Sequence, residues 1–179
     1  VLGGAMFRDF AIVATAFGAE MDALKRAGRV GALSVVLGVV LSFVTGAVVA
    51  IGFGFTDAVS ISTIGAGAAT YIVGPVTGTA LGADSAVIAL SVAAGLVKAI
   101  LVMVATPLVA KRIGLNNPQS ALIYGGLMGT TSGVAAGLAA TDPKLVPYGA
   151  MTATFYTGVG CLLAPSVLYL SVIPLQGLL

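Results

Sequence analysis

Apolar residues occur along the chain in long runs separated by short polar loops. The runs cover residues 1–18, 30–55, 58–81, 86–109, 119–140 and 145–173. Charged residues, Pro and Asn collect between them, mainly in 20–29, 111–118 and 142–144. A run of about 20 apolar residues has the length of a helix that crosses a hydrocarbon core of roughly 30 Å. The pattern therefore predicts an all-α integral membrane protein built from transmembrane helices.

Two of these runs are interrupted near their centres. Run 58–81 breaks at Tyr71–Pro75, and run 119–140 breaks at Gly129–Gly133. About 11 helical residues precede each break, and they reach about 16 Å, or half of the hydrocarbon core. Irregular backbone at that depth must be buried in protein or line a wet cavity. We therefore predict that both runs are re-entrant helical hairpins with their tips near the membrane midplane.

The distribution of basic residues favours the same topology. Cytoplasmic loops carry an excess of Lys and Arg, and the basic residues of the loops are Lys25, Arg26, Arg29, Lys111, Arg112 and Lys144. They share one side of the membrane only if both interrupted runs return to the side from which they enter. A hairpin followed by a helix then occurs twice, over about 58–109 and 119–173, in an inverted-topology repeat. Paired interrupted segments of this kind indicate the binding site of a secondary transporter, and an elevator-type movement is a further hypothesis.

Composition narrows the class of function. Hydrophobic residues make up 59% of the chain and charged residues 8%, with one Cys and no His. No metal-ligand cluster, nucleophile with its base or phosphate-binding loop is evident, so we expect neither an enzyme nor a prosthetic group, and no nucleic-acid partner. Residues 1–179 form a single transmembrane domain in this interpretation. Because the sequence opens inside an apolar run, we expect that N-terminal helices are missing from it.

The hairpin tips carry the residues best suited to binding. We predict a half-helix over Gly133–Ala140 with Ser132 as its N-cap, and a second half-helix that starts at Pro75. Two helix N-termini would present free amides to the midplane, which suits a dianion. The alternative is that Gly, Ser and Thr only allow close packing. Lys98, near the centre of run 86–109, needs a partner, either a substrate carboxylate or carbonyl groups at a hairpin tip.

The remaining polar residues point to the coupling ion. Arg8 and Asp9 form either a structural ion pair or part of the site, and the other acidic residues flank the apolar runs. This favours sodium coupling through hydroxyl and carbonyl oxygens over proton coupling. The candidate substrate-binding residues are Thr130, Thr131, Ser132, Gly133, Gly74, Thr77, Lys98 and Arg8. The candidate sodium ligands are Thr70, Thr79, Gly129 and Thr154.

Small residues recur along run 30–55 at every fourth position. They are Ser34, Gly38, Ser42, Gly46, Ala50 and Gly54. Such a stripe lets two helix backbones approach closely. It packs either within the chain or against another subunit, which leaves a higher oligomer open.

Three long motifs resemble a known family. The stretches "TIGAGAATYIVGPVTGTALGA", "GLVKAILVMVATP" and "GLMGTTSGVAAGLAATDPKLVPYGAMTATFYTG" are similar to MadM, the larger membrane subunit of the bacterial malonate:sodium symporter. The resemblance implies sodium-coupled uptake of malonate by a multi-pass protein of the bacterial inner membrane, together with the small subunit MadL. A fainter likeness connects the hairpin tips to the LrgB/CidB membrane proteins. The alternative functions are therefore an LrgB-like exporter or pore for other small carboxylates, or a membrane scaffold subunit that does not transport.

Overall fold

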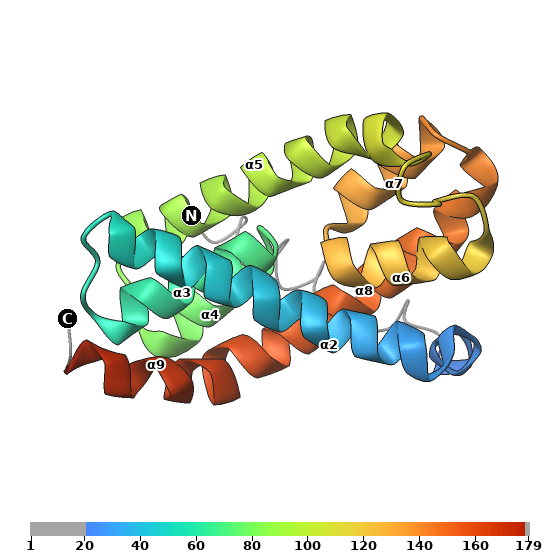
Figure 1. Ribbon diagram of the computed structural model, residues 1–179. Coiled ribbons are helices and arrows are strands. Elements are labelled where there is room, and N and C mark those ends of the chain that lie inside the picture. The colour runs from blue at the N-terminus through green and yellow to red at the C-terminus, as the bar shows by residue number, and fades with distance from the viewer. Residues whose placement is uncertain (1–20, 178–179) are drawn as a thin grey trace, which may run out of the picture.

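A computed structural model describes residues 21–177, and of residues 21–27 only the backbone. Run 1–18 and Arg8 thus lie outside the described residues. The described part is helical, without strands (Figure 1). Its elements are α2 (Met21–Gly52), α3 (Ala58–Ala69), α4 (Val73–Leu81), α5 (Ser85–Val109), α6 (Pro118–Met128), α7 (Thr131–Ala139), a 3₁₀ turn (Pro143–Leu145), α8 (Val146–Leu163), a π turn (Ala164–Leu168) and α9 (Tyr169–Gln176).

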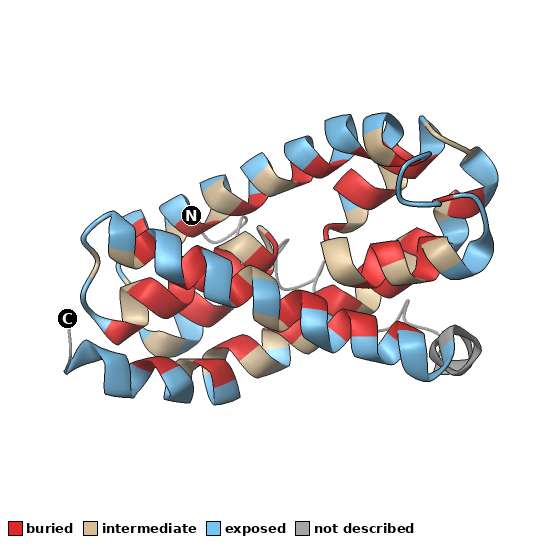
Figure 2. Cartoon of the chain, viewed as in Figure 1, coloured by how far each residue is buried: buried red, intermediate tan, exposed pale blue. Residues whose placement is uncertain are grey.

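Long apolar helices form the length of the molecule. Within the described residues, three stretches are long and apolar enough to cross a membrane, Gly28–Gly52, Ser85–Val109 and Pro143–Gln176. They run along the molecule in alternating directions, with α2 packed on α8 and α5 on the far side of the hairpins (Figure 1). Their outward faces are apolar and open (Figure 2), and Leu108 and Leu162 are each 73% exposed. Large exposed apolar faces on every long helix are the surface that lipid covers, so the protein is a membrane protein.

Each interrupted run forms a hairpin of two short helices. The predicted breaks are present, since α3 and α4 are separated at Thr70–Ile72 and α6 and α7 at Gly129–Thr130. Gly129 takes the left-handed conformation, with φ of 72°, which a side chain would make costly. The two hairpins start from opposite ends of the molecule and turn near its middle (Figure 1). Each hairpin is followed by a long helix, α5 or α8 with its π turn and α9.

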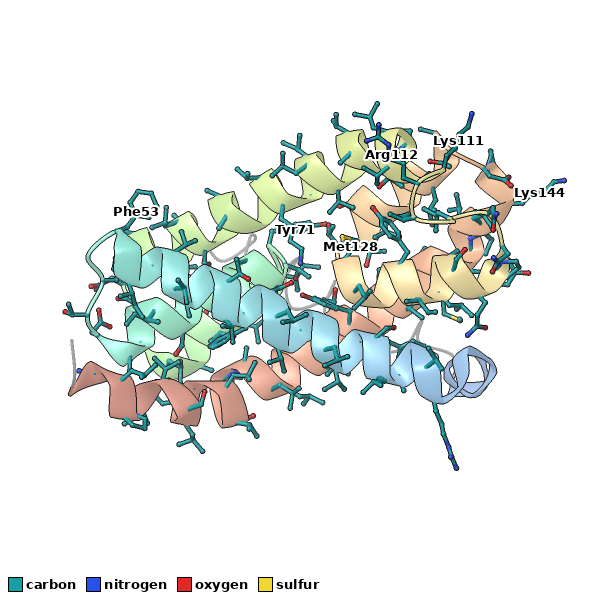
Figure 3. The ribbon with its side chains drawn as sticks, in the orientation of Figure 1. Phe53, Tyr71, Lys111, Arg112, Met128 and Lys144 are labelled. Atoms are coloured by element: carbon teal, nitrogen blue, oxygen red, sulfur yellow. The ribbon has the colours of Figure 1, made fainter. Side chains whose placement is uncertain are left out.

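The loop charges lie at the ends of the molecule. Lys111, Arg112 and Lys144 occupy the same end as the start of α2, which carries Arg29 (Figure 3). Asp84 precedes α5 at the opposite end. The described basic loop residues therefore share one end, as the sequence predicts.

The stripe of small residues on α2 packs within the chain. Gly38 lies against the backbone of α6, where an added Cβ would come within 2.8 Å of the Leu127 carbonyl oxygen. Gly46 lies against Gly65 of α3. The α2 helix thus touches both hairpins closely, which settles an alternative that the sequence leaves open. Gly54 is exposed beyond the end of α2 and takes no part.

Candidate functional site

Lys98 projects from the middle of α5 into the centre of the protein. Its ammonium group donates hydrogen bonds to the Ser42 hydroxyl at 2.9 Å, the Ala69 carbonyl at 2.9 Å and the Tyr156 hydroxyl at 3.2 Å. Ala69 is the last residue of α3, so its carbonyl lacks the helical partner that a following turn would supply. Of the two partners that the sequence suggests for Lys98, the structure contains the hairpin-tip carbonyl.

Tyr156 connects this lysine to the rest of the protein. Its hydroxyl donates to the Gly38 carbonyl at 3.1 Å, and its ring centroid lies 5.0 Å from the Lys98 ammonium. Gly129, at the tip of the second hairpin, lies directly against the ring. Sequence reasoning missed Tyr156. The available signal was a tyrosine in the middle of an apolar run, because a buried phenol hydroxyl needs a hydrogen-bond partner.

A cavity of about 470 Å³ opens beside Lys98. It is lined by Leu41, Ser42 and Thr45 of α2, Ala68 of α3, Ala94 and Lys98 of α5, and Leu127 and Met128 of α6. Figure 3 shows Tyr71 of the first tip and Met128 of the second in this central region. The cavity is thus mainly apolar, with one cation and two hydroxyls as its polar groups. An apolar lining with a few polar groups is the general pattern of a small-molecule pocket.

Helix α5 lies across both hairpin tips (Figure 1). At Gly95 an added Cβ would come within 2.8 Å of the Gly67 carbonyl oxygen in the first hairpin. At Gly133, in the second hairpin, it would come within 2.6 Å of the Ala99 carbonyl oxygen. Gly95 and Ala99 are one helical turn apart, so one face of α5 touches both tips and Lys98 lies between the two contacts.

The first tip is already capped by the chain itself. The Thr70 hydroxyl accepts from the amides of Ile72 at 3.2 Å and Val73 at 3.1 Å. The sequence predicts that α4 starts at Pro75, but the helix starts two residues earlier, at Val73. The hydrogen bonds from the amides to Thr70 support this earlier start. Gly74 packs tightly against Ser91 of α5. The N-terminus of α4 therefore has few amides left for a ligand.

The second tip is open by comparison. The α7 helix starts at Thr131 with Thr130 as N-cap, so the predicted N-cap Ser132 is wrong; Ser132 lies inside the first turn and is exposed. Thr130 is 1% exposed, and its hydroxyl has no hydrogen-bond partner. No described group caps the amides of Thr131, Ser132 or Gly133. These donors are free to bind an anion.

The other candidate residues are spread more widely. Thr77 is fully buried in α4 without a partner for its hydroxyl. Thr79 is exposed on α4, and Thr154 of α8 donates to the Ala150 carbonyl at 2.9 Å. Of the candidate residues that the structure describes, only Lys98 lines the central cavity. Gly129 contacts the Tyr156 ring, Gly133 packs on Ala99 of α5, and Thr70 follows Ala69, so these three lie next to Lys98 or one of its partners.

Apolar helices around an internal polar centre define a helical membrane protein with a buried site. The chain belongs to the family described as the malonate/sodium symporter MadM subunit, whose family model matches residues 1–175. The resemblance drawn from the three sequence motifs is therefore confirmed. Neither a curated protein nor a solved structure matches the chain. The family consists of transporter subunits, which are not enzymes.

Proposed function

We propose that this protein carries malonate together with sodium across the bacterial inner membrane, with MadL as its small partner subunit. The observation that carries the proposal is Lys98, a half-buried cation beside the central cavity. Within the described residues it contacts only uncharged groups, Ser42, Ala69 and Tyr156. A cation at this depth is costly unless an anion or polar groups offset its charge. A carboxylate of the substrate supplies that anion.

The second carboxylate of malonate binds at the open tip of the second hairpin. The free amides of Thr131, Ser132 and Gly133 and the Thr130 hydroxyl are the donors. Tyr156 supports this arrangement because it contacts both Lys98 and Gly129. The first tip lines the cavity through Ala68. Its amides do not bind the substrate, because the Thr70 hydroxyl already accepts from them. A dicarboxylate can therefore satisfy both the lysine and the helix N-terminus, and a monocarboxylate cannot.

The hairpins enter the membrane from opposite faces in this proposal. Three long stretches cross the bilayer, and α3–α4 and α6–α7 each return to the face from which they enter. The length of α3, 12 residues or about 18 Å, supports a tip near the midplane. The two hairpin-plus-helix units are then an inverted-topology repeat, and substrate moves by an elevator-type displacement of the hairpins against α2.

Single cysteines at Asp84 and Lys144 are expected to react with an impermeant maleimide from opposite faces of the membrane. Both positions are exposed; Lys144 lies at one end of the molecule (Figure 3), and Asp84, directly before α5, lies at the other (Figure 1). The measurement is labelling of intact cells and of inverted vesicles in a Cys161→Ser background. A cysteine at Asp57 is the matched control and should label from the same face as Asp84. Labelling of Asp84 and Lys144 from one face would contradict the re-entrant topology.

The double substitution of Thr130→Val and Ser132→Ala is expected to weaken malonate binding about tenfold or more. A hydrogen bond to a charged group contributes about 1.5 to 3 kcal/mol, which corresponds to roughly 10- to 150-fold in affinity. Binding is measured by titrating malonate at several sodium concentrations, with acetate as a competitor. Acetate should compete poorly in the unsubstituted protein.

Thr141→Val is the control for this titration. Its hydroxyl donates to the Gly137 carbonyl at 2.8 Å, at the far end of the same hairpin. The control should keep the original malonate affinity. Unchanged affinity in the double variant as well would mean that the hydroxyls of Thr130 and Ser132 do not contact the substrate.

The decisive test of the proposed function is uptake in proteoliposomes. The purified chain, with and without the small subunit, is reconstituted and supplied with labelled malonate under an inward sodium gradient. Accumulation that requires sodium and the small subunit supports the proposal. Uptake of other small carboxylates in preference to malonate would favour an LrgB-like function, and no uptake of any carboxylate would favour a scaffold subunit.

A further inference from the structure

Two buried hydroxyls in the first hairpin have no hydrogen-bond partner. They are Ser62 on α3 and Thr77 on α4, and both are fully inaccessible to solvent. Other helical hydroxyls nearby do have one, since Thr63 donates to the Val59 carbonyl at 2.7 Å and Ser91 to the Ile88 carbonyl at 2.7 Å. A buried hydroxyl without a partner costs folding free energy. Two such hydroxyls in one hairpin indicate that a bound ligand supplies the missing partner.

Ser62 and Thr77 lie at the same level of the hairpin. Gly78, the neighbour of Thr77, packs on Thr63, the neighbour of Ser62, and an added Cβ at Gly78 would come within 2.8 Å of the Thr63 methyl group. Because α3 and α4 run in opposite directions (Figure 1), Ser62 and Thr77 lie one residue to either side of this contact and differ by only about 3 Å in height along the hairpin.

A π turn packs against the hairpin at this height. Val73 of α4 contacts Gly160 of α8, where an added Cβ would come within 2.9 Å of Val73. One helical turn further along each helix lie Thr77 and Ala164, the first residue of the π turn, which contacts both α3 and α4. Pro165 has no amide hydrogen, so the regular helical pattern cannot continue there. π turns widen the helix and are frequent at functional sites.

We infer that Ser62, Thr77 and backbone carbonyls of the π turn bind one sodium ion. This rests on the proposed function, because it assigns a place to the coupling ion, and it differs from the candidate sodium ligands that the sequence suggests. The ligand class follows from the groups present. No group of His, Cys, Asp or Glu side chains in the described residues could hold a metal ion, and the described carboxylates, Asp57, Asp84 and Asp142, lie in loops at the ends of the helices.

Neutral oxygens without a carboxylate suit a monovalent ion. Magnesium and calcium sites in proteins normally include carboxylates. Sodium is held in transporters by hydroxyls and by carbonyls freed where a helix is interrupted. An ion here would link the first hairpin to α8 and α9, while the substrate occupies the other side of the same hairpin beside Lys98. The two ligands then stabilise one arrangement of the first hairpin, which is the basis of coupling.

The inference is tested by thermal unfolding of the full chain with its small subunit, titrated with sodium chloride against choline chloride without malonate. The unsubstituted protein should gain Tm with sodium. Thr77→Val, which keeps the side-chain shape, should equal or exceed its Tm without sodium, because the lost hydroxyl has no partner. With sodium, the Tm of Thr77→Val should be lower than the Tm of the unsubstituted protein. The sodium concentration that gives half of the maximal Tm increase should rise at least about tenfold. The same shift is expected for Ser62→Ala.

Two further variants make the test selective. Thr77→Ser keeps the hydroxyl and should keep the sodium response. Thr63→Val removes a hydroxyl that is already partnered within α3 and should leave the sodium titration unchanged, even though its Tm changes. An unchanged titration in both Thr77→Val and Ser62→Ala overturns this site but leaves sodium-coupled transport standing. Absence of any sodium response in the unsubstituted protein overturns sodium coupling and this site together.

Discussion

Lys98→Met is expected to raise the Kd for malonate by roughly 30-fold or more and to abolish uptake at low malonate. Methionine keeps the length and apolar stem of lysine but has no charge. Removing one partner of a buried charged contact costs about 2 to 5 kcal/mol, and each 1.4 kcal/mol is about tenfold in affinity. The effect should be large because Lys98 is the one cation among the residues that line the cavity. The measurement is a malonate titration of the purified protein.

The folded state should survive this substitution. Lys98 has no described carboxylate partner, so its loss leaves no unpaired acid, only the Ala69 carbonyl and the Ser42 and Tyr156 hydroxyls to be satisfied by water in the adjacent cavity. Lys111→Met, in an exposed loop, is the matched control and should bind malonate normally. A Lys98→Met protein that binds malonate within about threefold of the unsubstituted affinity would contradict a carboxylate contact at this residue.

Gly38→Leu is expected to prevent α2 from packing against the second hairpin, and folded protein should be largely lost. A Cβ at Gly38 would lie 2.8 Å from the Leu127 carbonyl oxygen and 2.9 Å from its Cα. Overpacking of this kind costs typically about 1 to 3 kcal/mol, and more where the neighbour is backbone that cannot turn aside. The Gly38 carbonyl also accepts from Tyr156, so the Lys98 network should be disturbed as well.

The measurement is the yield of monodisperse protein in size-exclusion chromatography, with its Tm. Gly52→Leu is the control, because a Cβ at Gly52 on the same helix would meet no atom within 4 Å. The control protein should be recovered normally. A Gly38→Leu protein with normal recovery and Tm would mean that α2 and α6 do not approach as closely as this structure indicates.

The sequence by itself determined that the protein lies in a membrane, which segments form helices, and where two of those segments are interrupted. Hydropathy sums over neighbouring residues, so runs such as 86–109 identify membrane helices without any knowledge of their partners. Gly129 and Pro75 restrict or interrupt the helical backbone locally, so their positions predicted both breaks to within a few residues. The same hydropathy pattern places Lys111 and Lys144 in loops between the apolar runs. Even the need of Lys98 for a partner is a property of its depth alone.

Only the tertiary structure decided which groups meet. The partners of Lys98 include Ser42 and Tyr156, which are 56 and 58 residues away along the chain. Each hairpin tip has a threonine, yet the Thr70 hydroxyl turns back to cap its helix and the Thr130 hydroxyl does not. Ser62 and Thr77 become candidate sodium ligands only because the fold buries them without partners beside a π turn. Periodicity and hydropathy are local quantities, whereas hydrogen-bond partners depend on how distant helices are positioned, so no local pattern could assign them.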